Sequence, residues 1–243
     1  AALKRWQSRL SAGAFAIVEH SKQWGVRHLV PGDDEWPAGL DDLRINAPVC
    51  MWARGSGFVG SPVLPARTLA LVGSRAATSY GIDVATDIAA TVAQRGGVVV
   101  SGGAFGIDAA AHRGALTTGA TAAVLAGGLD DFYPRGNAEL LTDVANRGVV
   151  MSEAPLGVRP TRWRFLARNR LIAAIAGATV VVEAAWRSGA LSTAAHADSL
   201  SRLVGAVPGS VHSAASGGCH RLVRERGAML VTGADDALEL VAD

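Results

Sequence analysis

Cysteine is scarce in this sequence, which has only Cys50 and Cys219 among its 243 residues. Neither has a second cysteine or a histidine at the spacing of a zinc-binding motif, apart from His220 directly beside Cys219. The two cysteines lie far apart in the chain, and a disulfide between them is the less favoured alternative. We therefore expect a reduced, cytoplasmic protein without a metal site.

Long hydrophobic runs are also missing. Candidates such as residues 173–182 have the length of a strand or a short helix, well below the roughly 20 residues needed to span a bilayer. Residues 1–10 carry charges and no apolar core follows them, so they do not resemble a secretory signal. We expect no membrane association. With 49% hydrophobic and 18% charged residues, the composition is that of an ordinary globular protein.

Lysine is nearly absent, with two lysines against 21 arginines, and the formal net charge is only +2. Acidic residues are missing altogether between Glu153 and Glu183. That segment nevertheless contains five arginines: Arg159, Arg162, Arg164, Arg168 and Arg170. Unopposed arginines repel one another, so this local excess of positive charge favours an anionic partner.

From residue 69 onward, short apolar runs alternate with segments of helical periodicity. The predicted strands cover residues 69–72, 98–100, 121–125, 149–151, 179–182, 203–207 and 229–231. The predicted helices cover residues 80–95, 107–116, 138–146, 169–176, 191–201 and 220–226. Strands separated by helices need crossover connections, which predicts an α/β fold: a Rossmann-like, doubly wound, mostly parallel sheet with helices on both faces.

The first part of the chain has a looser pattern, with four tryptophans and several prolines before residue 66. We expect a helix at 4–23, a strand at 26–29 and a flexible linker at 55–65. The predicted domains are therefore a small N-terminal extension, 1–66, that packs on the core, and a Rossmann-like domain, 67–243.

Two of the predicted strands end in glycine-rich turns: residues 69–75 read LALVGSR and residues 98–108 read VVVSGGAFGID. Parallel strands deliver such turns to the carboxyl edge of the sheet, where ligands bind. Glycines let backbone N–H groups approach an anion, and arginine can grip phosphate with two hydrogen bonds. This predicts a phosphate site built from Gly73, Ser74, Arg75, Ser101, Gly102, Gly103 and Gly106. The dinucleotide spacing G-x-G-x-x-G is missing, so we expect no NAD and no other cofactor.

Further polar residues should reach the same edge. Asp108 lies in the first turn of a predicted helix, where capping is its expected role and a catalytic one stays open. His112, one turn later, would pair with it at the surface. After the third predicted strand, Arg135 would point into the shared site and Asn137 would cap the next helix.

The strand that ends at Glu183 leads into another helix start, to which Ser188 and Gly189 belong. A carboxylate in this place can bind a ribose hydroxyl or serve as a general acid. We favour a third interpretation, in which Glu183 holds Arg168 or Arg170 in place, because basic neighbours need orienting.

Residues 162–170, which read RWRFLARNR, interleave arginines with aromatic residues. Such a stretch supplies both parts of a single-strand site: cations for the backbone and flat faces on which bases stack. The predicted contacts are Arg162, Phe165, Arg168, Asn169 and Arg170. In the alternative interpretation, Phe165 and Leu166 anchor the core and the basic face is merely solvated.

Six motifs, in order, resemble the DNA-processing protein A (DprA/Smf) family. They are GSR at 73–75, SGGAFGIDAAAHRGAL at 101–116, YPRGN at 133–137, RFLARNRLIAAIA at 164–176, VVVEAAWRSGALSTA at 180–194 and AVPGS at 206–210. The resemblance implies a Rossmann-like, cytoplasmic homodimer that binds single-stranded DNA and passes it to the RecA recombinase in natural transformation, with no enzymatic activity.

The sequence departs from the family pattern in two motifs. Leu166 stands where the family usually has proline, and Phe105 replaces a basic residue. The resemblance also implies that a preceding helical domain is largely missing here, as is a C-terminal winged-helix-like domain.

The leading hypothesis is a mediator that binds single-stranded DNA without sequence preference. Its phosphate contacts would be Arg75, Arg135, Arg162, Arg168 and Arg170, and Phe165 would stack a base. We expect alanine at Arg75 or Arg168 to weaken binding and leave thermal stability nearly unchanged. The alternatives are an enzyme or sensor that acts on a free nucleotide in the same crevice, and a structural dimerisation core.

Overall fold

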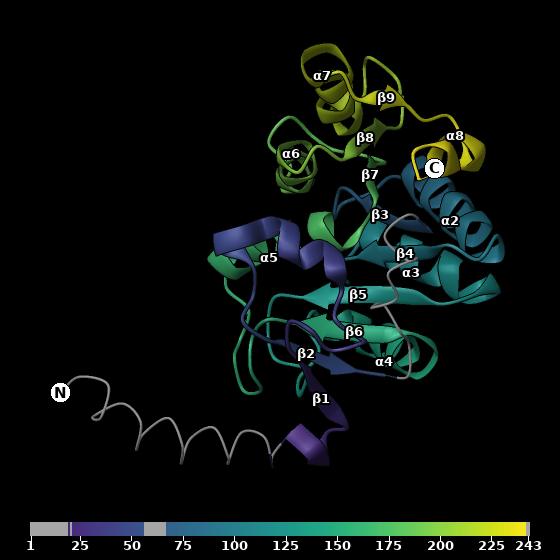
Figure 1. Cartoon of the computed structure of the whole chain (residues 1–243). Coiled ribbons are helices and arrows are strands. Elements are labelled where there is room, and N and C mark those ends of the chain that lie inside the picture. The colour runs from purple at the N-terminus through teal and green to yellow at the C-terminus, as the bar shows by residue number, and fades with distance from the viewer. Residues whose placement is uncertain (1–18, 20, 56–66, 242–243) are drawn as a thin grey trace.

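The computed structural model describes residues 19, 21–55 and 67–241 (Figure 1). Within these residues the chain forms a nine-stranded sheet in the order β1-β2-β6-β5-β4-β3-β7-β8-β9. The strands are β1 (Val26–Leu29), β2 (Met51–Arg54), β3 (Thr68–Val72), β4 (Val98–Ser101), β5 (Thr121–Leu125), β6 (Val149–Ser152), β7 (Ala178–Val181), β8 (Leu203–Ala206) and β9 (Met229–Leu230). All pairs from β6 to β9 are parallel, whereas the β1–β2 and β2–β6 pairs are antiparallel. The predicted α/β fold with a mostly parallel sheet is confirmed.

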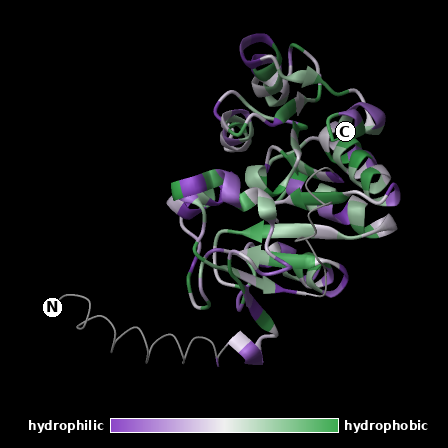
Figure 2. Ribbon diagram, in the orientation of Figure 1, coloured by the Kyte–Doolittle hydropathy of each residue, from purple (hydrophilic) through white to green (hydrophobic). Residues whose placement is uncertain are grey.

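Helices cover both faces of the sheet (Figure 1). One face carries α2 (Ser79–Gln94), α3 (Ile107–Thr118), α4 (Ala138–Arg147) and α8 (Ala234–Glu239), and the other carries α5 (Arg162–Ile175), α6 (Ala190–Ser199), α7 (Gly217–Arg226) and the 3₁₀ segment η1 (Ala38–Asn46). Two short 3₁₀ turns, η3 (Arg135–Asn137) and η4 (Ala214–Ser216), precede α4 and α7. Hydrophobic residues follow the central strands and hydrophilic ones gather on the outer helices (Figure 2).

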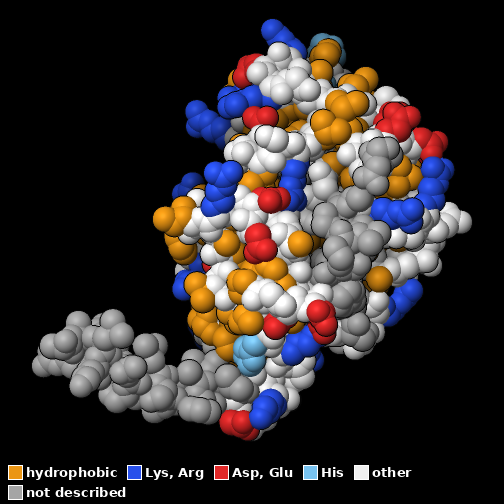
Figure 3. Space-filling view, in the orientation of Figure 1, with side chains coloured by type: hydrophobic (Ala, Val, Ile, Leu, Met, Phe, Trp, Pro, Cys, Tyr) orange, Lys and Arg blue, Asp and Glu red, His pale blue; other side chains and the backbone are white. Residues whose placement is uncertain are grey.

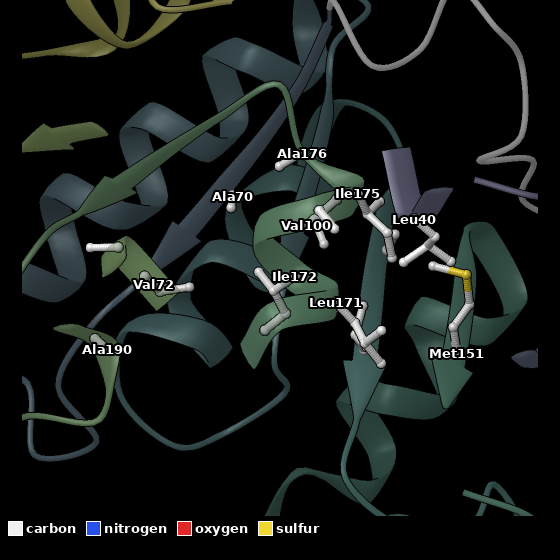
Figure 4. Close-up of a cluster of buried hydrophobic side chains, with 14 of the residues drawn as sticks. Leu40, Ala70, Val72, Val100, Met151, Leu171, Ile172, Ile175, Ala176 and Ala190 are labelled. Atoms are coloured by element: carbon white, nitrogen blue, oxygen red, sulfur yellow. The ribbon is translucent and has the colours of Figure 1, made fainter. Parts of the chain in front are cut away.

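The core lies on both sides of the sheet because side chains alternate along each strand. In β3, Leu69 and Leu71 join the cluster under α2 and α3, whereas Ala70 and Val72 face α5. Figure 4 shows Leu171, Ile172 and Ile175 of α5 gathered with Leu40 of η1, Val72, Val100 and Met151. One side of α5 is thus fixed in the core, and its other sides are free to line a surface.

Five elements were not anticipated: β2, α8 and the 3₁₀ segments η1, η3 and η4. Helix α5 also begins at Arg162 and not at residue 169. The Thr161 hydroxyl accepts a hydrogen bond from the Arg164 N–H, so this residue caps the helix. The first turns of α5 face solvent and carry no apolar periodicity, which is the signal from which helices are predicted.

The N-terminal part contributes β1 and β2 to the same sheet. Most of the predicted helix at 4–23 and nearly all of the predicted linker at 55–65 lie outside the described residues. The domain boundary at residue 66 stays a prediction.

His112 of α3 is fully buried, which corrects the expected surface pair with Asp108. Its Nδ1 lies 2.9 Å from the Thr121 Oγ1, whose own proton is donated to the Val99 carbonyl at 2.7 Å. The hydroxyl must therefore accept from the imidazole, so Nδ1 carries the proton of a neutral ring. Burial, with a smaller effect from the positive charge of Arg168, lowers the pKa of His112 to about 3.

This burial predicts a specific acid sensitivity. In the unfolded chain, His112 takes up a proton as the pH falls below its ordinary pKa of 6.5, whereas in the folded protein it stays neutral down to about pH 3. Its contribution to stability is present above pH 6.5 and is lost as the pH falls through this window. Urea unfolding of His112→Gln should therefore show a shallower loss of stability over that range than the wild type.

The exposed His212 provides the control. His212→Gln should retain the wild-type pH profile. Equal slopes for His112→Gln and the wild type would show that His112 is protonated in the folded state.

Candidate nucleic-acid interface

A cleft of about 800 Å³ opens at the carboxyl ends of β3 and β7, beside the first turns of α5. Five segments far apart in sequence contribute to its walls: the loop after β3, the turn after β4, the loop after β5, the N-terminal half of α5 and the loop between β7 and α6. Its lining includes Gly73, Ser74, Arg75, Ala104, Asp108, Tyr133, Thr161, Arg162, Phe165, Arg168, Asn169, Arg187, Ser188, Gly189 and Thr193. Ten of the predicted site residues are thus brought together.

The glycines at the strand ends serve close packing of the loops. The Ser74 N–H donates to the Glu183 carbonyl at 2.7 Å, and the Ile107 N–H donates to the Ser74 carbonyl at 3.1 Å. A Cβ on Gly106, whose φ is +73°, would collide with that Ser74 carbonyl. A Cβ on Gly73 would lie 2.6 Å from the Ile107 side chain. The loops after β3, β4 and β7 are therefore fastened to one another.

The carboxylate of Glu183 has a partner other than the one predicted. It accepts hydrogen bonds from the Thr78 N–H at 2.9 Å and from the Thr78 hydroxyl at 2.6 Å. The interpretation that Glu183 orients Arg168 or Arg170 is wrong. Its role is to join the end of β7 to the start of α2, whose N-cap is Thr78.

Asp108 binds N–H groups of the turn that joins β4 to α3. Its Oδ2 accepts from the Gly102 N–H at 3.2 Å and from the Ala104 N–H at 3.3 Å. Burial raises the pKa of this carboxyl, and the positive charge of Arg168 opposes the shift. The expected capping of α3 is therefore wrong: no side chain caps that helix, and Asp108 binds the turn that precedes it. Because the chain's own carboxylate binds these two donors, they are not free to cradle a phosphate.

Arg168 lies beneath the cleft and is 6% exposed. One of its terminal nitrogens donates to the carbonyls of Gly102, at 2.8 Å, and Val124. Burial lowers the pKa of Arg168 to about 10, so its guanidinium stays charged at neutral pH, with Asp108 favouring the charged form. Arg168 therefore fixes the glycine turn from below and brings a buried positive charge to the floor of the cleft.

An aromatic and cationic wall borders the cleft. The Arg75 guanidinium lies 4.7 Å from the centre of the Phe165 ring, a cation–π distance. The Tyr133 ring lies 5.9 Å from the same ring, inclined by 50°. Phe165 is half-buried and Tyr133 is 50% exposed. Phe165 therefore contacts both Arg75 and Tyr133 and is only partly covered by protein.

Several cations of the cleft have no carboxylate partner. Within residues 19, 21–55 and 67–241, Arg75, Arg162 and Arg187 take part in no ion pair, and all three are exposed. Three unpaired guanidinium groups around one cleft produce a positive potential that favours an anionic ligand.

Other predicted site residues lie elsewhere. Arg170 is on the far side of α5, where it pairs with Glu153 at 2.7 Å. Arg135 is exposed, 3.5 Å from Asp131. The Ser101 hydroxyl is buried and donates to the Leu71 carbonyl.

The expected cap on α4 is also absent. The Asn137 side chain makes no capping bond to that helix, and its amide donates to the carbonyls of Gly103 and Ala104. Ser101 and Asn137 thus support the glycine turn from within. Gly102, Gly103 and Gly106 shape that turn without lining the cleft.

Tyr133 and Arg187 line the cleft but were not predicted as site residues, although both stand in loops that were expected at this edge of the sheet. Their position could have indicated them, because each follows a buried strand, as Arg75 does.

The structure also shows free thiols at both cysteines, and its described residues hold no cluster of His, Cys, Asp or Glu suited to a metal ion. No helix in the described part of the chain is long and apolar enough to cross a membrane.

Comparison with known proteins agrees with this fold. The family model of DNA recombination-mediator protein A matches residues 27–242. A putative DNA processing protein DprA of Mycobacterium tuberculosis is 54% identical over 228 residues, which are 89% of this chain and 58% of the relative. The chain thus spans less than two thirds of that relative's length.

Solved structures give the same result. DNA processing protein A from Streptococcus pneumoniae matches with a TM-score of 0.80 and 38% identity, covering 88% of this chain and 73% of the other. DNA processing protein A from Helicobacter pylori, described for its single-stranded DNA binding mode, matches with a TM-score of 0.77 and 26% identity, covering 88% and 94%. The chain therefore belongs to the DNA recombination-mediator protein A family, DprA/Smf.

Proposed function

We propose that the cleft binds single-stranded DNA without reading its sequence. The observation that carries the proposal is the partly covered Phe165 ring in contact with Arg75 and Tyr133, with the unpaired Arg162 and Arg187 in the same lining. Every base has a flat face, so stacking on Phe165 or Tyr133 tolerates any sequence. The guanidinium groups contact the phosphates on either side of the stacked base.

The remaining predicted contacts divide by position. Ser74, Asn169, Ser188 and Gly189 line the cleft and act as polar contacts to the strand. Arg135 stands outside the lining and meets the strand only where it leaves the cleft. Asp108 and Arg168 lie beneath the strand, where they support the turn after β4 and determine the charge at the floor of the cleft.

We extend the proposal to a wider role, which the resemblance to the family supports. In the whole protein, the bound strand is handed to the RecA recombinase during natural transformation and recombination, by a homodimer in the cytoplasm. No catalytic residue is part of this proposal. The cleft is a holding site, and its chemistry is ionic contact and stacking.

A free nucleotide in the same cleft is the second candidate. A volume of about 800 Å³ suits a small ligand as well. Competition separates the two: a nucleotide site releases a labelled oligothymidylate when micromolar mononucleotide is added, whereas a polymer site retains it.

Binding should depend on Arg75 and on salt. Arg75→Ala removes one phosphate contact and the guanidinium that packs on the Phe165 ring. We therefore expect affinity for labelled oligothymidylate to fall by roughly tenfold with stability unchanged. The slope of log affinity against log salt should become shallower by about 0.7. Fluorescence anisotropy across a salt series measures both.

Arg147 at the end of α4 is the matched control, since it is exposed and lies at the opposite edge of the sheet. Arg147→Ala makes the same change in net charge and should bind as the wild type does. If both variants lose the same affinity, binding reflects net charge and not this cleft.

Arg168→Ala should behave differently, which corrects the expectation from sequence. It leaves the Asp108 carboxylate buried without its cation, a change that costs about 3 kcal/mol of unfolding free energy. Urea unfolding should show this loss. The double variant Arg168→Ala, Asp108→Asn should recover part of it, because the uncompensated charge is gone. A single variant as stable as the wild type would show that Arg168 does not support the fold.

A further inference from the structure

A second cleft, of about 520 Å³, lies on the other side of α5. Its walls come from η1, from the residues that follow β6 and from α5 itself. We propose that a single strand bound in the first cleft continues across α5 into this second cleft, where a base stacks on Trp163 and a phosphate contacts Arg164. This inference rests on the proposed function and extends its site.

Helix α5 divides its residues between the two clefts. Arg162, Phe165 and Asn169 line the first, whereas Trp163, Arg164 and Arg170 line the second. Leu166 faces the first cleft and Ala167 the second, as expected when successive residues turn around a helix axis. Arg168 lines both. The clefts are therefore adjacent, and α5 is the ridge between them.

The second cleft has the charge that a phosphate backbone requires. Arg164 takes part in no ion pair within the described residues. Glu153, the carboxylate of the lining, is already paired with Arg170 at 2.7 Å. Arg170 also donates to the Asn46 carbonyl and so fastens η1 to α5. The cleft retains an excess of positive charge after its own carboxylate is neutralised.

The cleft also offers a flat apolar face to solvent. Trp163 is 71% exposed, and Ile45 of η1, in the same lining, is 96% exposed. Figure 3 shows hydrophobic and basic side chains next to each other on the side of the molecule where α5 and η1 lie. An exposed indole beside an unpaired arginine is the pairing of groups that binds a base and its phosphate. A protein partner would also use the apolar surface, but the free arginine and continuity with the first cleft favour DNA.

The test is a length series. Labelled oligothymidylates of about 4 to about 16 nucleotides are titrated against the chain by fluorescence anisotropy. For the longest, Trp163→Ala should weaken binding about tenfold, and for the shortest it should have no effect. Trp163→Phe keeps a stacking face and should restore most of the affinity. Arg164→Ala should lower the salt dependence for long strands only.

Leu203→Ala is the matched control, because Leu203 is 50% exposed at the start of β8, away from both clefts. It should bind every length as the wild type does. Circular dichroism confirms that each variant is folded.

The outcomes separate this inference from the proposed function. If Trp163→Ala binds every length as the wild type does while Arg75→Ala is weakened, the first cleft binds DNA, and the second serves another partner such as a protein. If the wild type binds no oligothymidylate of any length, the proposed function fails and this inference fails with it. Equal loss at all lengths in Trp163→Ala also overturns the inference, since a strand held in the first cleft and too short to cross α5 does not reach Trp163.

Discussion

The buried guanidinium of Arg168 determines how the site is built. It donates to the carbonyls of Gly102 and Val124, which joins the turn after β4 to the end of β5. Its charge also favours the Asp108 carboxylate, and that carboxylate in turn binds the N–H groups of Gly102 and Ala104. A cation and an anion thus hold the same turn, and the attraction between them offsets part of the cost of burying each charge.

This arrangement moves the chemistry of the site from backbone to side chains. In many nucleotide-binding folds, a glycine-rich turn at a helix N-terminus offers its N–H groups to a phosphate. Here Asp108 already binds two of those groups, and the glycines allow the loops after β3 and β4 to touch. The cleft therefore presents guanidinium groups and aromatic rings, which suit a polymer of repeating phosphates and bases better than one fixed pyrophosphate.

Much of the fold could be predicted because the central strands are short apolar runs, two of which end at glycine, and most of the helices between them carry apolar periodicity. The cleft could be placed at the carboxyl edge for the same reason. What could not be predicted depends on contacts across the sheet. Arg168 and Arg170 are two residues apart in one motif, yet the first is buried against Gly102 and the second pairs with Glu153. Glu183 bonds to Thr78, a partner that its position in sequence does not indicate.

The most direct test of this account is a crystal structure of the chain with a bound oligothymidylate. The account predicts a base stacked against Phe165, a phosphate at Arg75, and the Asp108 carboxylate still bound to the N–H groups of Gly102 and Ala104. A phosphate seated on those N–H groups, with Asp108 displaced, would contradict it, because the glycine turn and not the side chains would then hold the strand.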